Sequence, residues 1–162
     1  MSVFSEYQTD TIDLALDFYG YEDCPKNYEF GPSVRDNFVL HFVTKGKGVF
    51  HFEKKEIHLE AGDLFLLPKN KVTYYQADSE EPWSYYWIGI SGTKVSDFMR
   101  FSTLQEKGFL KKTEVDTERI GLFMEQLVHK AEASKMTSHY QLHLLSQIYE
   151  LLFLISEVAP DI

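Results

Sequence analysis

The chain has 162 residues, with 44% hydrophobic and 25% charged residues, which is the composition of an ordinary globular protein with room for one sizeable domain and an appendage. The formal net charge is −9, from 16 basic and 25 acidic residues, which argues against direct binding to nucleic acid or to an anionic membrane surface, because both require a positive face. The single cysteine excludes an internal disulfide and a Cys-rich zinc site.

Residues 1–13 are mostly polar and show no steady period, so we expect them to form an N-terminal arm. This segment carries Glu6, Asp10 and Asp13 and lacks the apolar stretch of a signal peptide. The longest run of aliphatic and aromatic residues near the C-terminus, residues 151–155, is far shorter than a membrane span. Together with the lone cysteine, these features predict a reduced, cytoplasmic location.

From residue 14 to residue 87 the pattern is typical of short strands joined by turns. Residues 38–43 form an apolar and aromatic run, which is followed by Gly46 and Gly48 and by a second run at residues 49–52. Glycines between two such runs predict a β-hairpin with its turn at residues 45–48.

Further strands are predicted downstream of this hairpin. Ile57 and Leu59 alternate with polar residues, as in a half-buried strand, and residues 64–67 form a fully apolar strand. Residues 73–76 and 84–90 are two more candidates. Short strands at this spacing indicate a β-sandwich or a barrel.

After Gly92 the pattern becomes helical. Asp116 and Thr117 are placed to cap a helix whose apolar residues recur at helical spacing. These residues are Ile120, Phe123, Leu127 and Ala131. Ser138 could cap a second helix that runs to about Val158 and is ended by Pro160. The sequence therefore predicts a mostly β domain followed by two antiparallel helices.

The second helix carries two apolar stripes. One stripe consists of Leu142, Leu145, Tyr149, Leu152 and Ile155. The other consists of Leu144, Leu151, Leu154 and Val158. A helix that packs on one core needs a single stripe, so we expect the second stripe to form a dimer interface. The alternative, in which the neighbouring helix and the barrel cover both stripes, stays open.

Several motifs of residues 24–92 occur together in a fixed order. They are Gly31-Pro32 with Arg35-Asp36, Gly46-Lys47-Gly48, the strand from Gly62-Asp63 to Pro68, Tyr74-Tyr75 with Ala77-Asp78, and the segment from Pro82-Trp83 to Gly92. In this order they resemble the effector-binding domain of the AraC family of transcription regulators, most of all members that control the use of oligomeric sugars.

The resemblance implies a cupin-like barrel, also called a double-stranded β-helix or jelly roll, over residues 14–108, and a helical dimerisation segment over residues 109–162. In the family a helix-turn-helix half binds DNA, and it would begin beyond Ile162. We therefore expect it to be absent from this chain, so that DNA is contacted only through a missing domain.

Metal-bearing cupins hold their metal through histidines and a glutamate at positions that this chain fills differently. The glutamate position falls at Val39 and the late histidine at Thr73, while residues 33–35 contain no histidine. A metal ion needs three or four donor atoms that converge on it. We therefore expect no metal, no other cofactor and no reaction that uses a metal as a Lewis acid.

The same mapping predicts which side chains point into the barrel, because strands alternate with period two. The expected ligand-binding residues are Arg35, His41, Thr73, Tyr75, Tyr85 and Trp87. In the best-studied branch of the family, sugar contacts come from the positions of Tyr75, Tyr85 and Trp87, and a looser alignment adds Cys24. Trp87 could stack on a pyranose face, while the polar groups meet its hydroxyls. The competing interpretations are that Trp87 and His41 belong to the core and that Arg35 pairs with Asp36.

Three classes of function fit a cupin-like barrel with an aromatic interior. The first is a sugar-sensing, dimerising domain of a transcription regulator, and the second is a metal-free cupin enzyme that acts on a sugar. The third is a stand-alone carbohydrate-binding module. The enzyme would need a general acid and a general base inside the barrel, where only His41 is expected. The stand-alone module would not need the helices, so the regulator is favoured and no catalytic residue is assigned.

Overall fold

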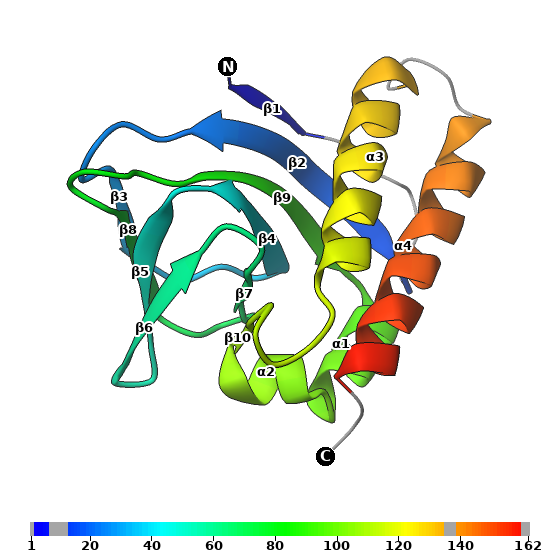
Figure 1. Cartoon of the computed structure of the whole chain (residues 1–162). Coiled ribbons are helices and arrows are strands. Elements are labelled where there is room, and N and C mark those ends of the chain that lie inside the picture. The colour runs from blue at the N-terminus through cyan, green and yellow to red at the C-terminus, as the bar shows by residue number, and fades with distance from the viewer. Residues whose placement is uncertain (1, 7–12, 135–138, 160–162) are drawn as a thin grey trace.

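The computed structural model describes residues 2–6, 13–134 and 139–159. Two antiparallel sheets face each other, and two long helices pack on the outer side of the larger sheet (Figure 1). The strands are β1 (Val3–Glu6), β2 (Ala15–Asp23), β3 (Glu29–Ser33), β4 (Phe38–Lys45), β5 (Lys47–Phe52), β6 (Lys55–Glu60), β7 (Leu64–Leu67), β8 (Thr73–Ala77), β9 (Ser84–Ser91) and β10 (Phe109–Leu110). The helices are α1 (Thr93–Arg100), α2 (Thr103–Lys107), α3 (Glu118–Ser134) and α4 (Tyr140–Val158).

The larger sheet has the strand order β1-β2-β9-β4-β7-β10, and the smaller sheet has the order β3-β8-β5-β6. The predicted fold class, mostly β with helices at the C-terminal end, is confirmed. The strands predicted between residues 38 and 90 correspond to β4–β9.

The predicted hairpin at residues 45–48 is wrong. β4 pairs with β7 and β9 in the larger sheet, whereas β5 pairs with β6 and β8 in the smaller one. Gly46 has φ = 73°, and a Cβ atom there would lie 2.3 Å from the carbonyl oxygen of Pro82. The glycine thus lets the chain cross from one sheet to the other close beside a neighbouring loop, rather than fold back on itself.

The N-terminal arm predicted for residues 1–13 is in part a strand, which corrects that interpretation. Val3–Glu6 forms β1 and pairs with residues 18–21 of β2. Four residues are too few to show an alternating pattern, and the hydrogen bonds that hold this strand come from β2. Residues 7–12 of the predicted arm lie outside the described residues.

The larger sheet separates two hydrophobic clusters, because alternate residues of each strand point to opposite faces. Along β9, Tyr85 and Trp87 point between the two sheets, while Tyr86, Ile88 and Ile90 point to the helices. The cluster between the sheets is rich in aromatic rings, and the cluster under the helices is mostly aliphatic. A cavity between the two sheets is lined by residues of the first cluster.

Helices α3 and α4 run antiparallel against the outer face of the larger sheet (Figure 1). Helix α3 begins at Glu118, directly after the predicted cap Thr117, and buries the expected residues Ile120, Leu127 and Ala131. The predicted cap Ser138 and the predicted end Pro160 of the second helix lie outside the described residues.

The stripe chosen for dimerisation on α4 is largely buried within the chain. Leu144 and Leu151 are 0% exposed and Leu154 is 3% exposed, while Val158 is half-buried. Helix α4 contacts both α3 and β2, and packing against two neighbours covers a wider face than one stripe. The large apolar side chains that α4 leaves exposed are Tyr140, Leu142, Tyr149 and Phe153. Two of these, Leu142 and Tyr149, belong to the other stripe.

The short elements α1, α2 and β10 connect the barrel to the helices and were not predicted individually. β10 pairs with β7 and so extends the larger sheet.

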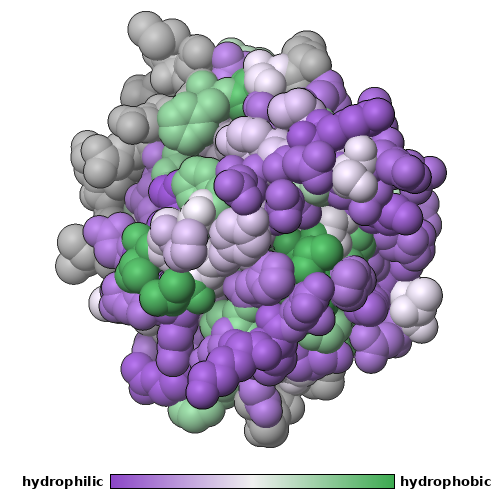
Figure 2. Space-filling model, turned by 90° about the vertical axis from the view of Figure 1, so that its left-hand side faces the viewer, coloured by the Kyte–Doolittle hydropathy of each residue, from purple (hydrophilic) through white to green (hydrophobic). Residues whose placement is uncertain are grey.

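Within the described residues, no helix is long and apolar enough to cross a membrane. Figure 2 shows the face over the smaller sheet, which is mostly hydrophilic, with only small separate apolar areas.

Candidate ligand-binding site

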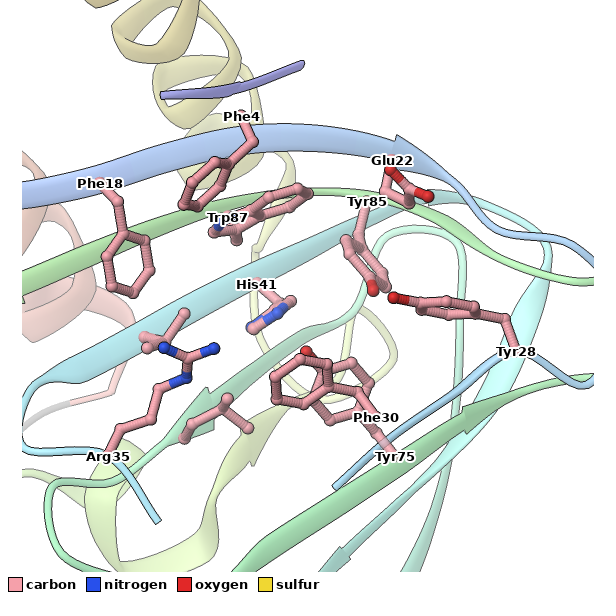
Figure 3. A pocket seen from close by; sticks show the side chains of 12 residues that line it. Phe4, Phe18, Glu22, Tyr28, Phe30, Arg35, His41, Tyr75, Tyr85 and Trp87 are labelled. Atoms are coloured by element: carbon pink, nitrogen blue, oxygen red, sulfur yellow. The ribbon is translucent and has the colours of Figure 1, made fainter. Parts of the chain in front are cut away.

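A cavity of about 340 Å³ lies between the two sheets, and most of its lining is aromatic (Figure 3). It is lined by Phe4, Phe18, Glu22, Tyr28, Phe30, Arg35, Val39, His41, Leu67, Tyr75, Tyr85 and Trp87. The volume lies at the lower end of the range for small-molecule sites, which runs from roughly 300 to 1,000 Å³. Few polar groups among many rings is also the usual composition of such sites.

The indole of Trp87 forms one wall of the cavity and lies across the backbone of β2. Gly20, its cross-strand neighbour, leaves room for the ring, because a Cβ atom at this position would lie 2.2 Å from the indole. The ring of Phe4 on β1 stacks near Trp87, with 6.2 Å between the ring centroids. Strand β1 therefore contributes to the wall of the cavity, and Trp87 is half-buried rather than sealed in the core.

His41 lies at the centre of the cavity wall, with its ring 4.3 Å from that of Phe65 and nearly parallel to it. Burial and, to a smaller extent, the positive charge of Arg35 lower the pKa of His41 to about 3. The imidazole is therefore neutral at physiological pH, with one nitrogen that donates and one that accepts. Its buried Nδ1 has no hydrogen-bond partner among the described residues, and Figure 3 shows the ring facing the open cavity.

Tyr75 and Tyr85 complete this part of the wall, and their rings meet that of His41 edge-on. Burial raises the pKa of both phenols well above the usual value. Both hydroxyls are therefore protonated at neutral pH and can donate as well as accept hydrogen bonds.

Arg35 closes one end of the cavity, where its guanidinium lies between two rings. The Cζ atom is 5.3 Å from the ring centre of Phe18 and 5.2 Å from that of Phe30, which are cation–π distances. In the described part of the chain no carboxylate pairs with Arg35, so the expected alternative of a pair with Asp36 is not seen. The buried Nε has no hydrogen-bond partner there either. The guanidinium therefore lies between two aromatic faces at this end of the cavity.

Five of the predicted ligand-binding residues line the cavity: Arg35, His41, Tyr75, Tyr85 and Trp87. Two do not, which corrects the prediction. Thr73 is buried two residues before Tyr75, where β8 meets the end of β3, and it borders a separate surface depression. Cys24 is buried among the rings of the inner cluster and does not reach the lining; burial raises the pKa of its thiol to about 11.

The remaining lining residues were missed by the sequence analysis. Phe4 lies on β1, Phe18 and Glu22 lie on β2, and Phe30 lies on β3 with Tyr28 just before it; none of these strands was predicted. Val39 and Leu67 lie on the predicted strands β4 and β7. A bulge at residues 16–18 breaks the alternation of β2, which removes its signal. Strand β3 contains Pro32, which is tolerated because β3 is at the edge of its sheet.

The chemistry available in the cavity is that of hydrogen bonding and stacking. Among the described residues, no group of three or more His, Cys, Asp and Glu side chains is placed to hold a metal ion. Val39, at the position of the cupin glutamate, lines the cavity with an aliphatic side chain. That the domain carries no metal stays a prediction, for which this lining gives the chemical reason.

A family model described as the AraC-like ligand binding domain matches residues 15–152. The chain is 36% identical over 160 residues to the Msm operon regulatory protein of Streptococcus mutans, and this alignment covers 99% of this chain and 56% of that protein. It is 40% identical over 100 residues to the raffinose operon transcriptional regulatory protein of Pediococcus pentosaceus, which covers 60% of this chain and 36% of that protein. It is 27% identical over 161 residues to the lactose operon transcription activator of Staphylococcus xylosus, which covers 99% of this chain and 57% of that protein.

The chain spans about half the length of the two relatives that it matches over nearly all its residues. Solved structures that align with it include a cupin superfamily protein of Desulfitobacterium hafniense, at 13% identity and a TM-score of 0.42, covering 55% of this chain and 76% of that one. An RmlC-like cupin of Methanocaldococcus jannaschii with a double-stranded β-helix fold aligns at 13% identity and a TM-score of 0.44, covering 60% of this chain and 86% of that one.

Proposed function

The chain belongs to the family of AraC-like ligand-binding domains, and from this membership we propose that it is the sugar-sensing domain of a transcription regulator. A neutral sugar binds in the cavity between the sheets and changes how the whole regulator acts on its operon. The names of the relatives, which are regulators of the Msm, raffinose and lactose operons, support a sugar as the effector. As in those regulators, the role is regulatory rather than enzymatic, and we place it in the cytoplasm.

The observation that carries this proposal is the pairing of aromatic faces with unsatisfied polar groups in one cavity. Trp87 offers an aromatic wall to the apolar face of a sugar ring, while the two tyrosine hydroxyls can donate to or accept from the sugar hydroxyls. Nδ1 of the neutral His41 imidazole and Nε of Arg35 lack hydrogen-bond partners in the described part of the chain. Groups of this kind are costly to bury unsatisfied, so a ligand that provides hydroxyls is stabilised by them.

A melting-temperature screen with mono- and oligosaccharides tests the proposal. A ligand at a hundredfold excess over Kd stabilises the folded state by about 2.7 kcal/mol, which raises the Tm of a domain of this size by several degrees. The variants Trp87→Phe, Tyr75→Phe and Tyr85→Phe should each reduce this shift, because they remove one contact and keep most of the ring.

Two neighbouring tyrosines provide matched controls. Tyr74 and Tyr86 lie on the same strands as Tyr75 and Tyr85 but point away from the cavity, toward Glu29 and His129. Tyr74→Phe and Tyr86→Phe should therefore leave the sugar-dependent shift unchanged. If no sugar in a broad panel raises the Tm, or if the cavity variants respond as the controls do, the proposed site is wrong.

We also propose that the domain dimerises through its helices, on the face that α4 leaves exposed. Leu142, Tyr149 and Phe153 lie on this face, and Leu122 is the exposed apolar residue of α3. Burying one such side chain contributes roughly 1.5–3 kcal/mol before the cost of association.

DNA contacts are assigned to another part of the regulator, since this chain has a net charge of −9.

A further inference from the structure

The cavity is longer than the part of it that surrounds Trp87 and His41. Phe18 and Glu22 both line it from β2, in regular register with β9, and lie four residues apart. Four residues of a strand span about 13 Å. Figure 3 shows Phe18 and Arg35 at one end, Glu22 and Tyr28 at the other end, and His41 and Trp87 between them. This length exceeds one pyranose ring and is close to that of two linked rings.

The end of the cavity at Glu22 carries two polar side chains, Glu22 and Tyr28, that are not among the sugar contacts proposed above. Glu22 is half-buried, and within the described part of the chain its carboxylate has neither a hydrogen-bond nor an ion-pair partner. Tyr28 lies at the same end of the cavity, with its hydroxyl toward that of Tyr85 (Figure 3), and 36% of its surface is exposed. The pKa of Tyr28 is raised by burial and next by the negative charge of Glu22, which agrees with their proximity.

A carboxylate with both oxygens free can accept hydrogen bonds from two adjacent hydroxyls, and such charge-assisted bonds are stronger than neutral ones. The phenol of Tyr28 adds a donor and an aromatic edge at the same place. Arg35 supplies only donors at the opposite end of the cavity, whereas Glu22 supplies only acceptors. A neutral molecule with hydroxyl groups at both ends satisfies both side chains without itself bringing a charge out of water.

We propose that Glu22 and Tyr28 form an outer subsite for the second sugar unit of a glycoside, whose first ring lies between Arg35 and Trp87. The effector class is then a neutral disaccharide or longer oligosaccharide. Because Tyr28 is partly exposed, any further unit extends from this end into solvent. This inference rests on the proposed function, since it assigns a second part of the same cavity.

Titration calorimetry with matched ligand pairs tests the subsite. Each pair consists of a glycoside and the methyl glycoside of its terminal unit: lactose with methyl β-D-galactopyranoside, and raffinose with methyl α-D-galactopyranoside. The same pairing applies to any other oligosaccharide that raises the Tm in the screen above. The longer ligand of the pair should bind more tightly. Glu22→Gln should weaken it about tenfold, the size of one charge-assisted hydrogen bond, and leave the methyl glycoside unchanged.

Two further variants make the result specific to the outer subsite. Tyr28→Phe should act in the same direction as Glu22→Gln, while Glu56→Gln, an equal change of charge on the exposed strand β6, should change neither ligand. If both ligands of every pair bind equally well, or if Glu22→Gln weakens both alike, the subsite is refuted while the sugar-sensing function stands. If no sugar binds the wild-type chain, both proposals fail.

Discussion

Two glycines on neighbouring strands determine where the rings of the cavity can lie. A Cβ atom on Gly20 of β2 would meet the indole of Trp87 on β9, and a Cβ atom on Gly89 of β9 would lie 2.4 Å from the ring of Phe18 on β2. Each ring therefore lies flat across the glycine of the other strand. Glycine lowers the strand propensity at these two positions, and its missing side chain leaves the space that each ring occupies.

We predict that Gly20→Ala disturbs the proposed sugar site by displacing the indole of Trp87. The new methyl group would overlap the indole of Trp87 and also the carbonyl oxygen of Val3, so the ring must shift and the domain should lose about 1–3 kcal/mol of stability. Sugar binding, followed by calorimetry, should weaken strongly although no contact residue has changed.

A double-mutant cycle separates the two overlaps. In the Trp87→Phe background the ring is smaller, so Gly20→Ala should cost less unfolding free energy than in the wild type. The position of the indole is wrong if Gly20→Ala costs the same in both backgrounds.

The neutral state of His41 has two consequences for pH dependence. Burial lowers the pKa of His41 to about 3 in the folded chain, from 6.5 for an exposed imidazole. His41 therefore stays neutral from about pH 5 to pH 8, and its protonation should not change the sugar affinity over this range. As the pH falls from 6.5 toward 3, His41 takes up a proton in the unfolded chain but not in the folded chain. The free energy of unfolding therefore decreases progressively over this pH range.

Denaturant unfolding between pH 4 and pH 7 checks the second consequence. The free energy of unfolding of the wild type should fall more steeply with decreasing pH than that of His41→Gln, by up to about 1.4 kcal/mol per pH unit. Equal slopes for the two proteins would show that His41 is accessible to protons in the folded chain.

Helix α4 has two apolar faces with different roles. One face, which includes Leu151, is buried against α3 and β2, and the other carries Phe153, which is 53% exposed. Because the two residues are two positions apart on one helix, they form a matched pair that distinguishes folding from association.

We predict opposite outcomes for substitutions of this pair. Leu151→Ala should lower the free energy of unfolding by roughly 2–5 kcal/mol, as for other buried leucines. Phe153→Glu should leave a folded domain and convert the dimer to a monomer, as measured by sedimentation at micromolar concentration. A wild-type chain that stays monomeric at high concentration would contradict the dimer, and a Phe153→Glu dimer would place the interface elsewhere.

The elements that could be predicted from the sequence are those with an uninterrupted pattern. β4 and β7 are apolar runs, β6 alternates, and α3 repeats at helical spacing, so all were recognised. Strand β2 could not be, because its bulge shifts the alternation, and β1 could not be, because its pairing depends on β2. The side chains that line the cavity from these two strands were missed for the same reason.

Burial on α4 shows a second limit of pattern analysis. Two apolar stripes were visible in the sequence, but the buried face takes Leu144 and Leu151 from one stripe and Leu152 and Ile155 from the other. Which residues it includes depends on how the helix is rotated against α3 and β2. The sequence pattern of one helix does not contain that rotation. Leu144 and Leu142 are two residues apart, yet Leu144 is buried and Leu142 is 76% exposed.

On the scale of the whole molecule, one sheet serves two functions. The inner face of the larger sheet lines the ligand cavity, and its outer face carries the helices. The Tyr86 hydroxyl on β9 forms a hydrogen bond with His129 on α3. The flanking residues Tyr85 and Trp87 of the same strand face the cavity (Figure 3). The cavity and the helical surface are therefore separated by the thickness of a single sheet.

Fluorescence quenching by acrylamide tests the central claim, a sugar bound against Trp87, most directly. The chain has two tryptophans, of which Trp83 is 0% exposed and Trp87 is half-buried in the cavity wall, so only Trp87 should be accessible to the quencher. A sugar that raises the Tm should suppress this quenching with the same concentration dependence. A sugar that stabilises the chain but leaves the quenching of Trp87 unchanged would show that the ligand binds somewhere else.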